Sequence, residues 1–247
     1  MLNDLPMVRV ITPIYGFNEH FVRDMLTSLS AQTYDKKKIE HIIVLDMEPD
    51  DGEKALDSLT VMLKHFNTID TYIYKLRKHV GVSHARNVGL DCNTGEKHHS
   101  CVCFLDADNA IEEHFIETMV NLHTPNAVTV CNQLVFNTVI GPNELQGLRS
   151  WNPSAIGDHE INMSSIMRGN FIDLGCIMHP RCNVRFDPNL TRLVDWDYII
   201  ALSKRYHFYG IVDKLSYYRN HMGDKRICNT ESYQENHIKV VAKWKSA

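Results

Sequence analysis

The chain has 247 residues, 44% of them hydrophobic and 23% charged, with a formal net charge of -4 at pH 7. These values are typical of a globular domain with a sizeable core, and the acidic balance argues against nucleic acid as the main partner. No apolar run reaches the roughly 20 residues that span a bilayer, and residues 1–6 lack the pattern of a secretory signal. We therefore expect one cytoplasmic domain over residues 1–247.

The first half alternates strand-like apolar runs with segments of helical periodicity. Strands are predicted at 8–12, 39–45, 71–75, 100–105 and 127–131. Helices are predicted after Asn18, as its cap, to about residue 32, and at 52–66, 82–90 and 111–122. This order predicts βαβ units, and therefore an α/β fold with a mostly parallel central sheet flanked by helices. Right-handed crossovers bring loops 13–16, 46–51 and 106–109 to one edge of that sheet.

The second half, from about residue 133, is less regular, and we expect it to form a smaller irregular region. The segment from Gly141 to Met163 is predicted to be a long loop, in which Trp151 serves either as a stacking platform or as a buried anchor. Helices are predicted at 195–206 and 231–244, with a short strand at 209–212.

Seven cysteines, an odd number, lie mostly in apolar runs, which indicates reduced and buried thiols. His98, His99, Cys101 and Cys103 are close in sequence, but no paired C-x2-C set accompanies them, so structural zinc is disfavoured.

The segment CVCFLDADN, residues 101–109, carries two aspartates directly after an apolar run. If the run is a strand, Asp106 and Asp108 emerge at its carboxyl end, where open α/β sheets bind ligands, and their spacing lets both point the same way. Such a pair repels unless a cation or a hydrogen-bonding ligand lies between the carboxylates. Mg²⁺ or Mn²⁺ with a diphosphate fits that requirement. The alternative is an acidic turn or a helix N-terminus.

Two other strand ends carry candidate ligand contacts. Residues 13–16, PIYG, can pass close to a ligand, or form a simple connector. Asp46 can accept a hydrogen bond from a nucleobase imide or a ribose hydroxyl, or instead stabilise a turn.

The segment GVSHARNVGL, residues 81–90, predicts a helix that Ser83 caps and whose first N–H groups face anions. Arg86 lies in the first turn, where the helix dipole disfavours a cation. This position indicates an anionic partner such as Asp106 or a nucleotide; an ordinary internal salt bridge is the alternative.

Taken together, the strand-plus-proline start, IIVLD, GVSHARNVGL and CFLDADN resemble, in order and spacing, the inverting family 2 glycosyltransferases of the GT-A fold. The resemblance is close over the first half, to about residue 132, and looser over residues 133–247. It implies a GT-A fold with a nucleotide-sugar-binding half and an acceptor-binding half. One departure is that many relatives have DDGS where this chain has DMEP, residues 46–49.

The resemblance also implies a donor site and a metal site. The residues matched to the nucleotide-sugar site are Pro13, Tyr15, Asp46, Arg86, Asp106, Ala107 and Asp108. Asp106 and Asp108 match the family's DxD motif, in which Asp108 binds Mn²⁺ or Mg²⁺ and Asp106 contacts the ribose or the metal shell.

Two motifs of the second half resemble the family as well. VDWD, residues 194–197, resembles EDW-D and implies Asp195 as the catalytic base, although valine replaces the usual glutamate. Asp197 is a second candidate, and N-capping of the helix by Asp195 is the structural alternative. YYRNH, residues 217–221, resembles YR-H and implies that His221 binds the metal or the diphosphate, aided by Lys225 and Arg226; a basic surface loop is the alternative.

The sequence therefore predicts a metal-dependent enzyme that moves a sugar, with inversion, from a nucleoside-diphosphate sugar to a saccharide or glycan hydroxyl, as in polysaccharide biosynthesis. Peripheral membrane association stays open. Two other interpretations remain. One is a non-catalytic module that binds nucleotide sugars or glycans, and the other is a nucleotidyltransferase-like enzyme, although the glycine- and lysine-rich loop of that class is absent after the first strand.

Overall fold

The computed structural model describes residues 5–66, 68–95, 99–140, 145–152, 161–221 and 231–245, without the side chains of 136–140, 145–152, 212 and 218–221. The elements of the first half are β1 (Val8–Ile14), α1 (Glu19–Ser30), η1 (Lys36–Lys38), β2 (Ile39–Leu45), α2 (Pro49–Leu63), β3 (Asp70–Lys75), α3 (Val82–Asp91), β4 (Cys101–Phe104), β5 (Ala110–Ile111) and α4 (Phe115–Asn121). The second half contains β6 (Ala127–Ile140), β7 (Leu145–Asn152), α5 (Met163–Arg168), η2 (Leu174–Cys176), β8 (Ile177–Pro180), α6 (Val194–Ser203), β9 (His207–His221) and α8 (Tyr233–Lys245). Among these described helices, none is both long and apolar enough to cross a membrane.

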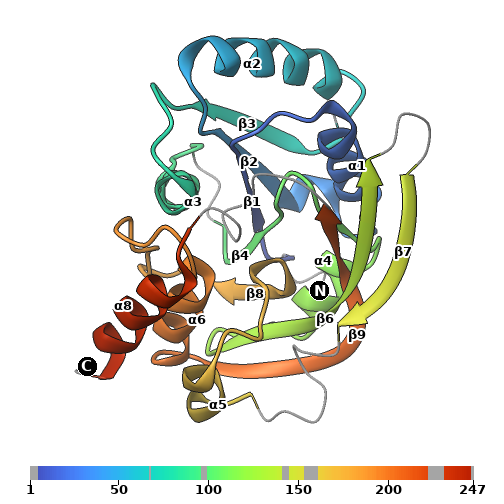
Figure 1. Ribbon diagram of the computed structural model, residues 1–247. Helices are drawn as coiled ribbons and strands as arrows, with labels where there is room; N and C mark the ends of the chain where they lie inside the picture. Colours follow the sequence, from blue (N-terminus) through green and yellow to red (C-terminus); the bar gives the residue numbers. More distant parts are fainter. Residues whose placement is uncertain are drawn as a thin grey trace.

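The described strands form one sheet with the order β3-β2-β1-β4-β8-β6-β9-β5, and β7 pairs with β6 outside this path (Figure 1). Strands β3, β2, β1 and β4 run parallel. Strand β8 is antiparallel to β4 and β6, while β6 and β9 are parallel to each other. The register pairs Ile14 with Leu45 and Ile11 with Phe104, so β1, β2 and β4 end at one edge. The predicted α/β class and the shared edge of the three loops are confirmed.

Local sequence explains the regular elements of the first half. All seven residues of β2 are buried, as expected for a parallel strand covered on both faces. Helix α1 begins where predicted, because the Asn18 side chain accepts from the backbone N–H groups of His20 and Phe21. Its Met25, Leu26 and Leu29 then join the core.

Four predicted elements differ from the structure. The strand predicted at 127–131 extends to Ile140, because β6 pairs with both β7 and β9. The segment 141–163, predicted as a loop, contains β7, which pairs antiparallel with β6 from Leu145 to Asn152. The strand predicted at 209–212 extends over 207–221, because β9 pairs along nearly all of β6 (Figure 1). The helix predicted from Ile111 begins at Phe115, since Ala110 and Ile111 pair with β9 instead. In each case strand pairing overrides a weak local pattern.

The cysteines of the described ranges carry free thiols, as predicted, and Cys101, Cys103, Cys131 and Cys176 are buried. Burial raises the pKa of the Cys101 thiol to about 12, which keeps it protonated and unreactive at neutral pH. Cys228 lies outside the described residues.

Helix α3 is held against the sheet by a buried arginine. Arg9, on β1, donates from Nε to Glu40 Oε2 of β2 at 2.6 Å. Its Nη1 donates to the carbonyls of Gly89 (3.2 Å) and Cys92 (3.0 Å) at the carboxyl end of α3. Because Gly89 has no side chain, α3 can pack closely on β1; a Cβ at this position would lie 2.5 Å from Ile11 Cγ2.

Gly89→Ala is therefore expected to lower the free energy of unfolding by about 1–3 kcal/mol, as overpacking does in cores. Urea unfolding measures the change. Gly169→Ala is the control, since nothing lies within 4 Å of a Cβ at that position, and it should change stability far less. Equal stability of wild type and Gly89→Ala would show that α3 can move away from β1 without cost.

Candidate active site

The ends of β1, β2 and β4 bring the predicted donor-site residues to one edge of the sheet. The parallel ladder continues one residue past the strands, since Asp46 N donates to Ile14 O (2.8 Å) and Leu105 N donates to Ile11 O (3.0 Å). Asp106 then begins a turn that is closed by Asn109 N donating to Asp106 O (3.0 Å). Ala107 and Asp108, within that turn, are partly buried. Pro13 and Tyr15 lie between these two acidic ends, at the end of β1.

Arg86 has the anionic partner that its position predicts. Its Nη2 donates to Asp106 Oδ1 at 2.9 Å; the arginine side chain is 7% exposed and the aspartate side chain 39%. The guanidinium also lies 5.4 Å from the ring centroid of Phe186. A buried guanidinium thus adjoins a carboxylate that still faces solvent and can accept a hydrogen bond or bind a cation.

Asp46 is occupied by the protein itself. Its carboxylate accepts from the backbone N–H groups of Val80 (2.7 Å) and Gly81 (2.9 Å), and His79 Nδ1 lies 3.1 Å from Oδ2. The side chain is only 2% exposed. These are the bonds of a turn-stabilising carboxylate, the alternative that the sequence left open.

The N-cap of α3 differs from the prediction. Gly81, at φ 103°, is the cap residue, and no side chain caps the helix. Ser83 lies inside the first turn with its hydroxyl buried and without a partner among the described residues. A cap residue in this left-handed conformation favours glycine, which explains why the serine two residues later does not cap.

Tyr15 and His79 form an exposed aromatic pair beside Asp46. The Tyr15 residue is 67% exposed, and its ring centroid lies 4.3 Å from that of His79. An exposed aromatic ring at the end of a parallel strand offers a flat surface to a planar ligand.

Asp195 lies in the first turn of α6. The cap residue is Leu193, at φ 60°, so the alternative in which Asp195 caps the helix is wrong. Asn170 Nδ2 donates to Asp195 Oδ2 at 3.2 Å and, of the described residues, it alone donates to this carboxylate. The other oxygen of the Asp195 carboxylate, Oδ1, can accept from another donor.

Asp197, the second candidate base, has a structural role. It is 1% exposed, and its two oxygens accept from Lys243 Nζ (2.8 Å) and Trp244 Nε1 (2.7 Å). Both donors belong to α8, which lies beside α6 in Figure 1. A carboxylate that is buried and engaged in this way does not face a substrate.

Asp173 joins the donor side to the acceptor side. Its pKa is raised to about 6, first by burial and then by the negative charges of Asp106 and Asp195, against the hydrogen bonds it accepts from Gly175 and Gln133. The charges of Asp106 and Asp195, from opposite halves of the chain, therefore both act on this one carboxyl group.

Sequence reasoning missed three supporting residues. Asn87 exchanges two hydrogen bonds with the backbone of Phe186, 99 residues away, at 2.9 and 2.8 Å. Asn170 and Asp173 belong to none of the motifs found in the sequence. Only the helical position of Asn87 next to Arg86 gave a hint, because such supporting contacts are long-range.

Some predicted residues fall outside the description. The side chains of His221 and Trp151, and the whole of Lys225 and Arg226, lie outside the described part of the structure. The described backbone of 217–221 belongs to β9, not to a surface loop.

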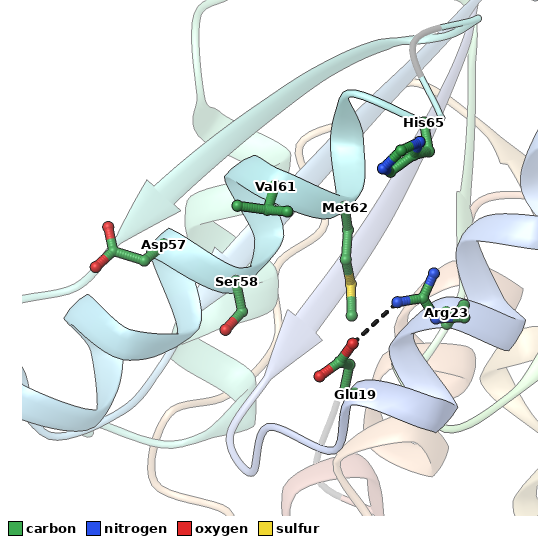
Figure 2. Close-up of a pocket in the computed structure, with 7 residues that line it drawn as sticks. All are labelled: Glu19, Arg23, Asp57, Ser58, Val61, Met62 and His65. Carbon is green, nitrogen blue, oxygen red and sulfur yellow. Dashed lines mark hydrogen bonds and ion pairs between the residues drawn. The ribbon is translucent and has the colours of Figure 1, made fainter.

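Two other features lie elsewhere. A pocket of about 360 Å³ between α1 and α2 is lined by Glu19, Arg23, Asp57, Ser58, Val61, Met62 and His65 (Figure 2). None of these is a predicted site residue. Glu112, Glu113 and His114 could share an ion, because their ligand atoms lie within 4.8 Å of one another, but they precede α4 and are largely exposed.

The raised pKa of Asp173 predicts a pH-dependent stability. The folded state binds this proton more tightly than the unfolded state, whose pKa is 3.8, so folding loses free energy as the pH rises from about 4 to about 6. In metal-free protein, Asp173→Asn should gain about 1–3 kcal/mol at pH 7.5 and little at pH 4, because an asparagine oxygen still accepts from Gly175. Thermal unfolding at both pH values measures this, and an equal effect at both would contradict it.

Comparisons with known proteins agree with this geometry. The family described as glycosyl transferase family 2 matches residues 9–181. A protein of Sulfolobus acidocaldarius named "Probable glycosyltransferase" is 26% identical over 135 residues, which are 54% of this chain and 27% of that protein.

Solved structures show the same fold. The structure of S. aureus TarS 1-349 in complex with UDP-GlcNAc superposes with a TM-score of 0.66 at 16% identity, over 95% of this chain and 64% of that one. The mannosyltransferase PcManGT from Pyrobaculum calidifontis, in complex with GDP-Man and Mn²⁺, has a TM-score of 0.63 at 14% identity, over 87% and 57% of the two chains. This chain thus spans less than two thirds of these relatives. The fold is the predicted GT-A fold, and the chain belongs to glycosyl transferase family 2.

Proposed function

We propose that the protein is an inverting, metal-dependent glycosyltransferase that uses a nucleoside-diphosphate sugar as donor and a saccharide or glycan hydroxyl as acceptor. The whole of residues 1–247 is one catalytic domain in this proposal, acting in the cytoplasm on polysaccharide or glycan synthesis. The single observation that supports it is that Asp106, paired with Arg86, and Asp195 both lie near enough to the buried Asp173 carboxyl group for their charges to raise its pKa. A donor-side carboxylate and a candidate base are thereby neighbours across one site.

The donor lies along the ends of β1, β2 and β4. Tyr15 offers its exposed ring to the nucleobase, and Pro13 and Ala107 line the strand ends beside it. Arg86 supplies a fixed positive charge next to Asp106. Asp46 acts indirectly, because its carboxylate holds the backbone of Val80 and Gly81 in place.

The residues present fit a divalent ion. Asp106 and Asp108 offer hard carboxylate oxygens, which suit Mg²⁺ or Mn²⁺, ions that keep coordination positions for phosphate oxygens. PcManGT was solved with Mn²⁺, which supports the same class of ion here. When bound, the ion would stabilise the negative charge of the departing diphosphate. His221 is proposed as a further ligand.

Asp195 is the proposed base. An acceptor hydroxyl must lose its proton as its oxygen attacks the anomeric carbon, and a carboxylate within hydrogen-bond reach takes that proton. Asn170 holds Oδ2 of Asp195, which leaves the second oxygen to face the acceptor. In one displacement the new glycosidic bond forms, the bond to the diphosphate breaks, and the configuration inverts.

Removal of the metal tests the donor site. EDTA, or Asp108→Ala in the presence of Mn²⁺, should lower the release of nucleotide from a panel of UDP-, GDP- and dTDP-sugars by about a hundredfold or more. Glu113→Ala is the control, because it alters the exposed acidic cluster and should leave the rate unchanged. Full activity in EDTA would contradict the proposed metal dependence.

The two aspartates of α6 should behave oppositely. Asp195→Ala should lower transfer or donor hydrolysis by about 10²–10⁴-fold without lowering the melting temperature. Asp197→Ala should lower the melting temperature, because it leaves Lys243 and Trp244 without their buried acceptor. Nucleotide-sugar binding by calorimetry, with no turnover in wild type, would favour the non-catalytic module instead.

A further inference from the structure

His79 occupies a position between the two features of the donor side that sequence analysis singled out. Its ring contacts the exposed ring of Tyr15, with centroids 4.3 Å apart and planes tilted by 42°. Its Nδ1 lies 3.1 Å from Asp46 Oδ2 and 3.2 Å from Asp46 O. The side chain itself is 39% exposed. The Nδ1 edge of the imidazole thus contacts the buried Asp46, while other parts of the side chain are accessible to solvent.

The contacts of Nδ1 fix the state of the ring. Both of its neighbours are acceptors, a carboxylate oxygen and a carbonyl oxygen, so Nδ1 carries a proton. In the neutral imidazole Nε2 is then an acceptor, on the far side of the ring from Asp46. Among the described residues nothing bonds to Nε2.

Asp46 is in turn a poor candidate for direct contact with a base. Two backbone N–H groups and His79 already use its oxygens, and solvent reaches 2% of its side chain. The acceptor that this end of the site presents outward is therefore on the histidine. Asp46 orients that acceptor, as second-sphere carboxylates orient histidines elsewhere.

We propose that His79 selects the nucleobase of the donor, by accepting through Nε2 the imide N–H of uracil, thymine or guanine while the base lies against Tyr15. This inference rests on the proposed function, since it concerns the nucleotide of that donor. Cytosine and adenine carry a lone pair where these bases carry the imide proton, so they would face Nε2 with two acceptors opposed. A site that hydrogen-bonds an N–H group discriminates strongly against an analogue that lacks it.

Calorimetry with nucleoside diphosphates and Mn²⁺ tests this without knowledge of the sugar or acceptor. UDP is compared with CDP, and GDP with ADP, at pH 8, above the range in which histidines ordinarily titrate. In the wild-type protein, UDP should bind about tenfold or more tightly than CDP, or GDP than ADP, or both. This comparison needs no substitution.

Three variants assign the preference to the histidine. His79→Phe keeps a ring against Tyr15 but has no acceptor, so the affinity ratio of UDP to CDP, or of GDP to ADP, should fall toward one. His79→Gln restores an acceptor oxygen and should recover part of it. His84→Ala, an exposed histidine on α3, should leave all affinities unchanged.

The outcomes separate the two proposals. If no nucleoside diphosphate binds wild type, the proposed function is wrong and this inference falls with it. If nucleotides bind but CDP or ADP matches its imide partner, or if folded His79→Phe keeps the wild-type ratio, only the role of His79 is overturned.

Discussion

Helix α3 is held between two buried charges, and the donor side of the site depends on this arrangement. Asp46 accepts from the backbone at the amino end of the helix, and Arg9 donates to carbonyls at its carboxyl end. Each charge has the sign that the helix dipole favours at that end. Arg9 lies on β1 and Asp46 directly follows β2, so both ends of α3 are fixed directly to the central parallel strands. Arg86, on this helix, therefore meets Asp106 at a fixed distance from the strand ends.

The same helix also joins the two halves of the chain. Asn87 bonds the backbone of Phe186, whose ring packs under the guanidinium of Arg86 and stacks on Tyr198 of α6, with ring centroids 4.0 Å apart. Helix α6 carries Asp195, so the donor-side cation and the candidate base share one packed support. Rigid elements of this kind hold reacting groups to the small tolerances that catalysis requires.

The sequence predicted those parts of the site that follow from local pattern. Apolar runs that end in aspartate located β2 and β4, and Asn18 located the start of α1. The hairpin strand β7 was missed because its composition is polar and its stability comes from pairing with β6. The engagement of Asp46 could not be predicted either, since its partners are backbone groups 34 and 35 residues away. Local propensity carries no information about such contacts.

The two aspartates of VDWD show why a motif alone leaves roles undecided. Both lie in the first turn of α6, where the dipole favours them equally. Asp197 points into a buried cluster from α8 and stabilises the packing of the final helix, whereas Asp195 meets Asn170 on the open side. Leu193, in a left-handed conformation just before the helix, sets the direction in which that first turn begins. Because the two residues are two positions apart, they face different sides of one helix, and Asp195 is only partly buried whereas Asp197 is 1% exposed.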